Sequence, residues 1–276
     1  MAIFIPDILL KEIEDKNRCM YAERSELTMD IVNIERDYLC ALAGQHSARI
    51  ENPKSVAYDE SVDDDKKRTR KNILRKYKAY LENAWFFGID NFELPLSADF
   101  IKKLALKADP DFFKNYHVAE LKGEMAPYRS VLEGVRSSGS KYTPPYPAKV
   151  PFEMQIFIGQ AKKMCEAIAE GYVHPVEFAA FCHFNIVRIH PFGDANGRTS
   201  RLVQDVILKK CGFIPAMIHE GERIHYYSLL ENAVGGYLLR DRNNFFEPSN
   251  EEKQFFVFIG SKVNTGLDSI LDKALR

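Results

Sequence analysis

The sequence predicts an all-α fold with one small β-hairpin. Three observations lead to this prediction: apolar residues recur every three or four positions along most of the 276 residues, strand-like alternation is scarce, and turn-forming residues separate the periodic segments. A chain of this length can bury a sizeable core, either as one large domain or as a main domain with a smaller lobe. We therefore expect a soluble globular protein.

Two helices are expected in the N-terminal third of the chain. Residues 28–52 carry apolar side chains at helical spacing, and this helix should end before Pro53 because proline disfavours a helical residue ahead of it. The charged run 63–68 places acids before bases, which suits the dipole at a helix start, and an apolar face continues to Trp85. We interpret this run as a solvated helix start and not as a functional site.

Further helices are expected towards the C-terminus, and loops separate them clearly. Their approximate ranges are 97–107, 151–170, 175–189, 198–210, 223–237 and 251–274. Residues 128–147 differ, because apolar positions flank the turn-forming run 137–140 and precede Pro144-Pro145. This pattern predicts a small β-hairpin followed by an extended entry into the next helix.

Composition and charge argue against several classes of partner. The 38 basic residues nearly balance the 39 acidic ones, and no basic stripe with interleaved aromatic residues occurs, so nucleic acid is not expected as a partner. Five scattered cysteines without Cys-x-x-Cys spacing fit a reducing cytoplasm better than a disulfide framework or a zinc knuckle. Pro6 and Asp7 interrupt the short apolar run at the N-terminus, and no apolar stretch could span a bilayer, so neither export nor a membrane location is expected.

Residues 190–201, His-Pro-Phe-Gly-Asp-Ala-Asn-Gly-Arg-Thr-Ser-Arg, carry the strongest functional signal. Pro191 should end the preceding helix at His190, and small or turn-forming residues then lead directly into the next helix. Such a loop leaves backbone N–H groups at a helix N-terminus, where the helix dipole also favours an anion. Arg198 and Arg201 lie three residues apart on one face, so together they indicate a phosphate-binding site.

Asp194 and His190 add catalytic chemistry to this anion site. A carboxylate at residue 194 would repel a polyphosphate unless a divalent cation such as Mg²⁺ bridged the two, so a nucleotide with magnesium is the expected ligand. A neutral imidazole at residue 190 is suited to take the proton from an attacking hydroxyl. The alternative is a capped helix junction with a buried, hydrogen-bonded histidine and arginines paired with surface acids. His183 is interpreted as a satisfied core residue, since its spacing from His190 does not match a zinc site.

The stretch 190–201 resembles the signature of the Fic (AMP-transferase) family, His-x-Phe-x-Asp/Glu-Gly-Asn-Gly-Arg-x-x-Arg. The resemblance implies a Fic-type helical core, in which a target Ser, Thr or Tyr hydroxyl attacks the α-phosphate of ATP. AMP would remain on a protein substrate, the chain itself among the candidates, and pyrophosphate would leave. The implied site residues are His190 as the base, Asp194 as the Mg²⁺ ligand, and Ala195, Asn196, Gly197, Arg198 and Arg201 as the nucleotide-binding residues.

One position departs from the family pattern, because Ala195 stands where relatives usually have glycine. Alanine tolerates a positive φ poorly, so a left-handed backbone at this residue would strain the phosphate site, whereas a negative φ would accommodate the methyl group. Gly197 stands where the related Doc toxin, which transfers a terminal phosphate, has lysine. The resemblance therefore favours adenylyl transfer.

Two weaker similarities lie outside the loop. The hairpin that follows Tyr128-Arg129 resembles the family's flap, which holds a target segment in extended form. The flap residues expected to contact the target are Val131, Leu132 and Glu133. Tyr226-Tyr227 resembles the stretch that lines the adenine pocket in relatives. The implied organisation is an N-terminal helical region at 1–94, a Fic core domain at 95–240 and a C-terminal helical extension at 241–276.

Residues 47–52, Ser-Ala-Arg-Ile-Glu-Asn, match the inhibitory pattern Ser/Thr-x-x-x-Glu-Gly/Asn of Fic relatives. Ser47 and Glu51 lie four residues apart on one helix face, so Glu51 can project towards Arg201. A carboxylate paired with Arg201 would occupy the γ-phosphate position and prevent productive ATP binding. With Asn52 completing the motif, the resemblance implies autoinhibition in cis. A solvated Ser/Glu pair on a surface helix is the alternative.

Two other functions remain open for the same site. In one, Glu51 positions a water molecule that hydrolyses AMP from a modified protein. In the other, Ala195 distorts the phosphate site so that catalysis is lost, and the protein is a non-catalytic nucleotide-binding interaction module. A homodimer remains open as the oligomeric state.

Overall fold

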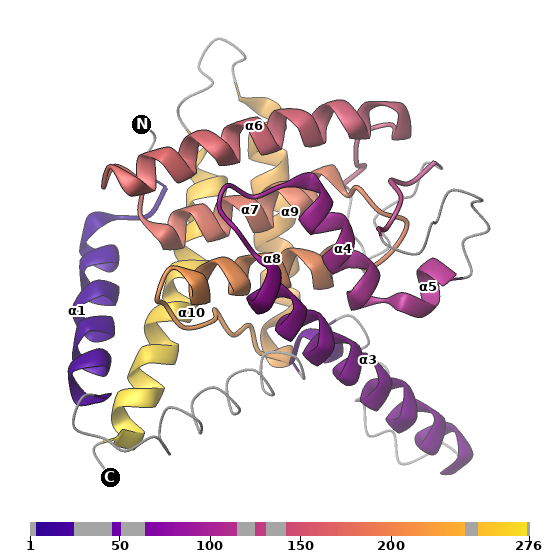
Figure 1. The fold of residues 1–276 in the computed structure, drawn as a ribbon, viewed down its shortest axis with the longest axis horizontal. Helices are drawn as coiled ribbons and strands as arrows, with labels where there is room; N and C mark the ends of the chain where they lie inside the picture. Colours follow the sequence, from indigo (N-terminus) through magenta and orange to yellow (C-terminus); the bar gives the residue numbers. More distant parts are fainter. Residues whose placement is uncertain are drawn as a thin grey trace.

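The computed structural model describes residues 4–24, 46–50, 64–114, 125–130, 142–240 and 248–274. Within these ranges the chain consists of helices and connecting segments, and no strand is present (Figure 1). The helices are α1 (Asp7–Arg24), α3 (Asp64–Asn91), α4 (Ala98–Ala108), α5 (Pro110–Lys114), α6 (Val150–Ala169), α7 (Pro175–Ile189), α8 (Asn196–Lys210), α9 (Arg223–Leu239) and α10 (Asn250–Ala274). Residues 46–50 are helical as well, and two short 3₁₀-helices, η2 (Pro147–Lys149) and η3 (Glu220–Glu222), precede α6 and α9.

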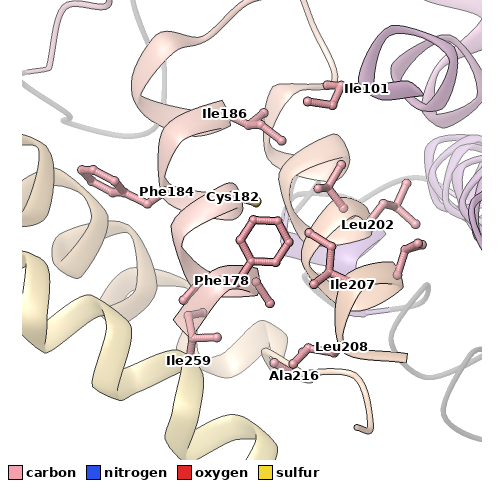
Figure 2. Packing of buried hydrophobic residues seen from close by; sticks show 14 of the residues in the cluster. Ile101, Phe178, Cys182, Phe184, Ile186, Leu202, Ile207, Leu208, Ala216 and Ile259 are labelled. Carbon is pink, nitrogen blue, oxygen red and sulfur yellow. The ribbon is translucent and has the colours of Figure 1, made fainter. Parts of the chain in front are cut away.

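Helices α7 and α8 form the centre of the fold, and most residues of both helices are buried. Figure 2 shows Phe178 and Cys182 of α7 directed towards α8, where Ile207 faces them. Burying each large apolar side chain stabilises the fold by about 1.5–3 kcal/mol. The loop that joins these helices therefore stands on the best-packed part of the protein.

The remaining helices surround this central pair. Helices α3 and α4 pack against α8, whereas α6 and α10 pack against α7, and α10 also packs against α9. Helix α1 lies alongside α10 (Figure 1). The chain before α1 is attached to the centre as well, because a carboxylate oxygen of Glu177 in α7 accepts the N–H groups of Phe4 (2.9 Å) and Ile5 (3.0 Å).

The predicted all-α class is confirmed, and the six helices expected after residue 95 are present with ends within two residues of the predicted ones. Of the helix expected at 28–52, only residues 46–50 lie in the described ranges, and they are helical. The sequence analysis missed α1 and the single-turn helix α5. Helices from all three predicted regions contribute to one buried cluster, and the boundaries after residues 94 and 240 remain predictions.

The predicted β-hairpin flap is wrong for the part of the chain that the structure describes. Residues 125–130 and 142–146 form no strand, and two backbone N–H groups of the first segment bond to distant parts of the chain. The Ala126 N–H donates to the Lys102 carbonyl of α4 (3.1 Å), and the Arg129 N–H donates to the Pro191 carbonyl (2.9 Å). The predicted flap residues Val131, Leu132 and Glu133 lie outside the described residues.

None of the described helices combines the length and the apolar character that crossing a bilayer requires.

Candidate active site

The loop between α7 and α8 has a left-handed residue at each end. His190 has φ 51° and ψ 59°, and Ala195 has φ 66° and ψ 6°. The His190 N–H still donates to the Ile186 carbonyl (2.9 Å), which closes α7, and the Thr199 N–H donates to the Ala195 carbonyl (2.8 Å), which opens α8. Two left-handed residues thus turn the chain from a helix C-terminus into a helix N-terminus over a few residues.

The side chain of Asn196 fixes the shape of this loop. Its Oδ1 accepts the Phe192 N–H (2.9 Å), and its Nδ2 donates to the Phe192 carbonyl (2.8 Å). The Phe192 ring is fully buried, with its centroid 6.2 Å from those of Phe113 and Tyr128. Asn196 was predicted to contribute through its backbone, but its side chain also bonds both backbone polar groups of Phe192.

Arg129 fixes the start of the loop, a role that the sequence analysis did not assign. This side chain is buried, and its Nε donates to the His190 carbonyl (2.7 Å). Its Nη2 donates to the Pro145 carbonyl, and its backbone N–H donates to the Pro191 carbonyl. Arg129 therefore satisfies carbonyls that the end of α7 leaves open, and it positions the backbone of His190.

Arg198 lies between two carboxylates. Its Nη1 is 2.9 Å from Asp109 Oδ2, its Nη2 is 3.0 Å from Asp194 Oδ1, and its guanidinium carbon lies 4.6 Å from the Tyr77 ring centroid. Arg198 is 3% exposed and Asp109 is 2% exposed, whereas the side chain of Asp194 is 50% exposed. The arginine expected at a phosphate thus also links α8 to the turn between α4 and α5 and orients Asp194. No sequence signal marked Asp109.

The position of Asp194 fits a magnesium ion that shares its coordination with phosphate oxygens. Asp194 Oδ1 accepts hydrogen bonds from Arg198 and from the Ala195 N–H, so the second carboxylate oxygen is the candidate ligand. Magnesium in nucleotide sites is usually bound by one or two carboxylates together with substrate phosphates and water. A single exposed aspartate at a helix N-terminus suits that arrangement.

Arg201 contacts the N-terminal segment that carries the predicted inhibitory motif. Its Nε donates to Ser47 Oγ (2.8 Å) and its Nη2 to the Ser47 carbonyl (3.3 Å), and both side chains are buried. The structure therefore brings together two of the predicted residues, although 154 positions separate them in the sequence. Glu51 and Asn52 lie outside the described residues.

Further contacts attach the segment 46–50 to the connection between α8 and α9. Arg49 Nη1 donates to both carboxylate oxygens of Glu220 (2.9 and 3.0 Å), and Arg223 Nε donates to the Ile50 carbonyl (2.8 Å). The side chains of Ala48 and Ile50 are fully buried. The segment is thus held by ionic, polar and apolar contacts together.

His183 is confirmed as a satisfied core residue. It is fully buried, with Nδ1 2.6 Å from Gln204 Oε1 and Nε2 2.8 Å from the Tyr226 hydroxyl. Tyr226 is fully buried too, whereas Tyr227 is partly exposed, with the guanidinium carbon of Arg223 4.9 Å from its ring centroid. The adenine-pocket role of the two tyrosines stays a prediction, and the Tyr226 hydroxyl faces the protein interior.

Asp205 gives a pH dependence that can be measured. Burial raises the pKa of Asp205 from its ordinary 3.8 to about 7. The folded state keeps a proton that the unfolded state releases, so this group lowers the free energy of unfolding as pH rises from about 4 to about 7. We expect Asp205→Asn to gain stability relative to the wild type over this range, by up to about 1.4 kcal/mol per pH unit. Urea unfolding at pH 4, 5, 6 and 7 measures this difference.

His183 makes the free energy of unfolding depend on pH in the opposite direction. Burial lowers the pKa of His183 from 6.5 to about 3, so the unfolded state binds a proton that the folded state excludes. This group lowers the free energy of unfolding as pH falls from about 6.5 towards 3. In Asp205→Asn the Asp205 contribution no longer offsets that of His183, and the free energy of unfolding should rise from pH 4 to 6.5. Parallel wild-type and variant profiles would contradict the assignment.

The left-handed backbone of Ala195 predicts that glycine is favoured at this position. An L-residue in this conformation lowers the free energy of unfolding by about 1–2 kcal/mol. Glycine avoids this strain, but its greater freedom in the unfolded state lowers the free energy of unfolding by about 0.4–1 kcal/mol. We expect Ala195→Gly to raise the free energy of unfolding by about 0.5–1 kcal/mol, measured by urea titration. Ala195→Val should lower it, because a β-branched side chain is an outlier at positive φ. A loss of stability in Ala195→Gly would show that alanine is unstrained here.

The fold and the site together define a class of protein: a helical domain in which arginine residues flank the loop between the two central helices. A family model described as the Fic/DOC family matches residues 95–208. The resemblance inferred from residues 190–201 is therefore confirmed, and the similarity to this family extends over residues 95–208.

Curated relatives and solved structures agree with this family. The protein adenylyltransferase Fic of Nematostella vectensis is 39% identical over 97 residues, which cover 35% of this chain and 22% of that protein. The corresponding Culex quinquefasciatus protein is 38% identical over 86 residues, which cover 31% of this chain and 17% of that protein. The chain thus aligns with about a fifth of the length of these relatives.

The structural neighbours support the fold over nearly the whole chain. A Fic-domain-containing signaling protein from Bacteroides thetaiotaomicron superposes with a TM-score of 0.71 and 19% identity, covering 97% of both chains. Fic-1 from C. elegans gives a TM-score of 0.61 and 19% identity, covering 96% of this chain and 71% of that one. At this identity the likeness describes the fold alone.

Proposed function

We propose that this chain is a protein adenylyltransferase, which moves AMP from ATP to a hydroxyl side chain of a target protein and uses Mg²⁺. The observation that carries the proposal is the arginine-flanked loop at the N-terminus of α8, with the exposed Asp194 oriented by Arg198. The names of the curated relatives, protein adenylyltransferase Fic, support it. A protein substrate, the chain itself among the candidates, and a cytoplasmic setting belong to the same proposal.

Each functional residue of the loop has a separate role in the proposed transfer. The first turn of α8 leaves the N–H groups of residues 196–198 without intrahelical acceptors, so they can bind phosphate oxygens of ATP. His190 takes the proton from the target hydroxyl as its oxygen bonds to the α-phosphorus, and the bond to the leaving pyrophosphate breaks. Mg²⁺ at Asp194 would neutralise phosphate charge. Catalysis then comes mainly from positioning and from charge stabilisation at a rigid loop.

We also propose that the segment 46–50, together with Glu51 beyond it, inhibits the transfer in cis. The contact of Ser47 with Arg201 supports this proposal, because the same guanidinium is assigned to the outer phosphate of ATP. Glu51 follows Ser47 by four positions in the sequence, the spacing of one helical turn. A carboxylate there would compete with the γ-phosphate for Arg201.

The activity and its inhibition are tested together by mass spectrometry of a cell lysate incubated with purified protein, Mg²⁺ and isotopically labelled ATP. We expect Glu51→Gly to raise AMP labelling of protein by about 5- to 150-fold over the wild type, the usual range for a coupling between two sites. The labelled peptides identify the target and the nucleotide in the same experiment. Unchanged labelling in Glu51→Gly would contradict the proposed inhibition. Absence of labelling in every variant would contradict the proposed transferase activity.

A second variant tests the inhibition through residues outside the loop. Glu220→Lys places a like charge against Arg49 and should detach the segment 46–50. We expect Glu220→Lys to raise labelling on its own and to add little in the Glu51→Gly background, because both changes release the same segment. Release of AMP from a pre-modified target by the wild type, lost in Glu51→Gly, would instead indicate the hydrolase.

A further inference from the structure

A chain of buried polar side chains reaches Arg201 at Nη1, a different nitrogen atom from those that contact Ser47. It runs from Asp205 through Gln204, His183 and Tyr226 to Arg201, with members from α7, α8 and α9. His183, Gln204 and Tyr226 have no exposed surface, and Asp205 and Arg201 are buried as well. Polar groups buried in a helical core lower the stability of the fold unless each of them is hydrogen-bonded.

The first bonds of the chain fix the orientation of the Gln204 amide. Asp205 Oδ1 accepts the Ala216 N–H (3.1 Å) and the Nε2 of Gln204 (3.0 Å). The amide nitrogen of Gln204 therefore points to Asp205, and its oxygen Oε1 points to His183, 2.6 Å from Nδ1. Because a carbonyl oxygen can only accept, His183 carries its proton on Nδ1.

The remaining bonds follow from this tautomer. Neutral His183 has an acceptor at Nε2, which the Tyr226 hydroxyl reaches at 2.8 Å, so the hydroxyl donates to the imidazole. Burial keeps the imidazole neutral. The hydroxyl oxygen of Tyr226 then presents its lone pairs to Arg201 Nη1, 3.4 Å away. Every donor in the chain therefore points from Arg201 towards Asp205.

Arg201 meets its two sets of partners with different nitrogen atoms. Ser47 accepts from Nε and Nη2, whereas Tyr226 accepts from Nη1. Loss of the segment 46–50 thus removes the contacts on one side of the guanidinium and leaves the Tyr226 contact in place.

We propose that Tyr226, itself oriented by His183, is a positioning residue that holds the Arg201 guanidinium ready for the terminal phosphate of ATP. This inference rests on the proposed function, which assigns Arg201 to that phosphate. Without the hydroxyl, the guanidinium of the released state would lose its fixed contact from α9. Binding of ATP would then have to include the ordering of a long side chain.

The test uses Tyr226→Phe in the Glu51→Gly background, because this change deletes one oxygen atom. We expect the KM for ATP in the transfer assay to rise about tenfold, with kcat changed less than about twofold, which is the pattern for a lost binding contact. Calorimetric titration with Mg²⁺ should show about tenfold weaker binding of ATP and unchanged binding of ADP, which lacks the terminal phosphate.

The control is Tyr237→Phe, which removes a hydroxyl from the same helix α9 at a ring that packs against Phe184. It should leave ATP and ADP binding unchanged. Equal weakening of ATP and ADP by Tyr226→Phe would show a general structural defect and overturn the proposal, as would unchanged ATP binding. The titrations need no turnover, so they decide the role of Tyr226 even if no AMP transfer is detected and the proposed function fails.

Discussion

In the Glu51→Gly background, replacement of His190 by asparagine is expected to lower the rate of AMP transfer by about 10²- to 10⁴-fold, the usual contribution of a general base. The imidazole sits at the end of α7 on a backbone that Arg129 fixes through the His190 carbonyl. Removing the imidazole leaves the attacking hydroxyl without its proton acceptor, while the phosphate-binding loop is kept. Initial rates of label transfer from ATP measure the effect.

The choice of asparagine keeps the fold of the loop intact. His190 has a positive φ, and asparagine occupies that conformation more readily than alanine does. The N–H and carbonyl of residue 190 retain their bonds to Ile186 and Arg129, since both bonds use backbone atoms of this residue. ATP affinity should therefore stay near that of the parent. A transfer rate within about threefold of the parent would place the base elsewhere.

Asp109→Ala is expected to lower the free energy of unfolding by about 3–5 kcal/mol, a large fraction of the stability of a typical domain. The change leaves the guanidinium of Arg198 buried without its main carboxylate partner, which lies 2.9 Å away in the wild type. Removing one partner of a buried ion pair destabilises a protein far more than the intact pair stabilises it. Urea unfolding monitored by circular dichroism gives the difference.

Two further variants separate this cause from a general effect of substitution. Asp111→Ala removes an exposed acid two residues along, which pairs with Lys76, and should change stability little. Arg198→Leu in the Asp109→Ala protein removes the buried charge that has lost its Asp109 partner and should restore part of the lost stability. A loss below about 1 kcal/mol in Asp109→Ala would mean that solvent compensates Arg198.

The local patterns of the sequence were enough to predict most helices and the loop. Helices after residue 95 have apolar faces of helical period. Helix α7 ends where Pro191 predicted, and α8 begins two residues before its predicted start. The residues of the 190–201 stretch could be assigned because they act together within a dozen positions. Helix α1 was missed because its apolar residues are sparse among charged ones.

Residues that act across long sequence distances could not be predicted in the same way. Arg129 donates to the carbonyl of His190, which lies 61 positions later in the sequence. Asp109, between α4 and α5, pairs with Arg198 of α8. Neither has a spacing that marks it, because the tertiary packing of distant segments brings these partners together. The hairpin prediction was wrong for the same reason: its turn signal was local, whereas the Arg129 N–H donates to the carbonyl of the distant Pro191.

The shared use of Arg201 by Ser47 and by ATP would have a thermodynamic consequence for the enzyme. Two ligands that exclude each other at one guanidinium weaken each other by the same factor, so ATP must loosen the segment 46–50 as much as the segment opposes ATP. The fraction of released protein would then follow the cellular ATP concentration. A partner protein that captured the released segment would act as an activator and would raise the apparent affinity for ATP.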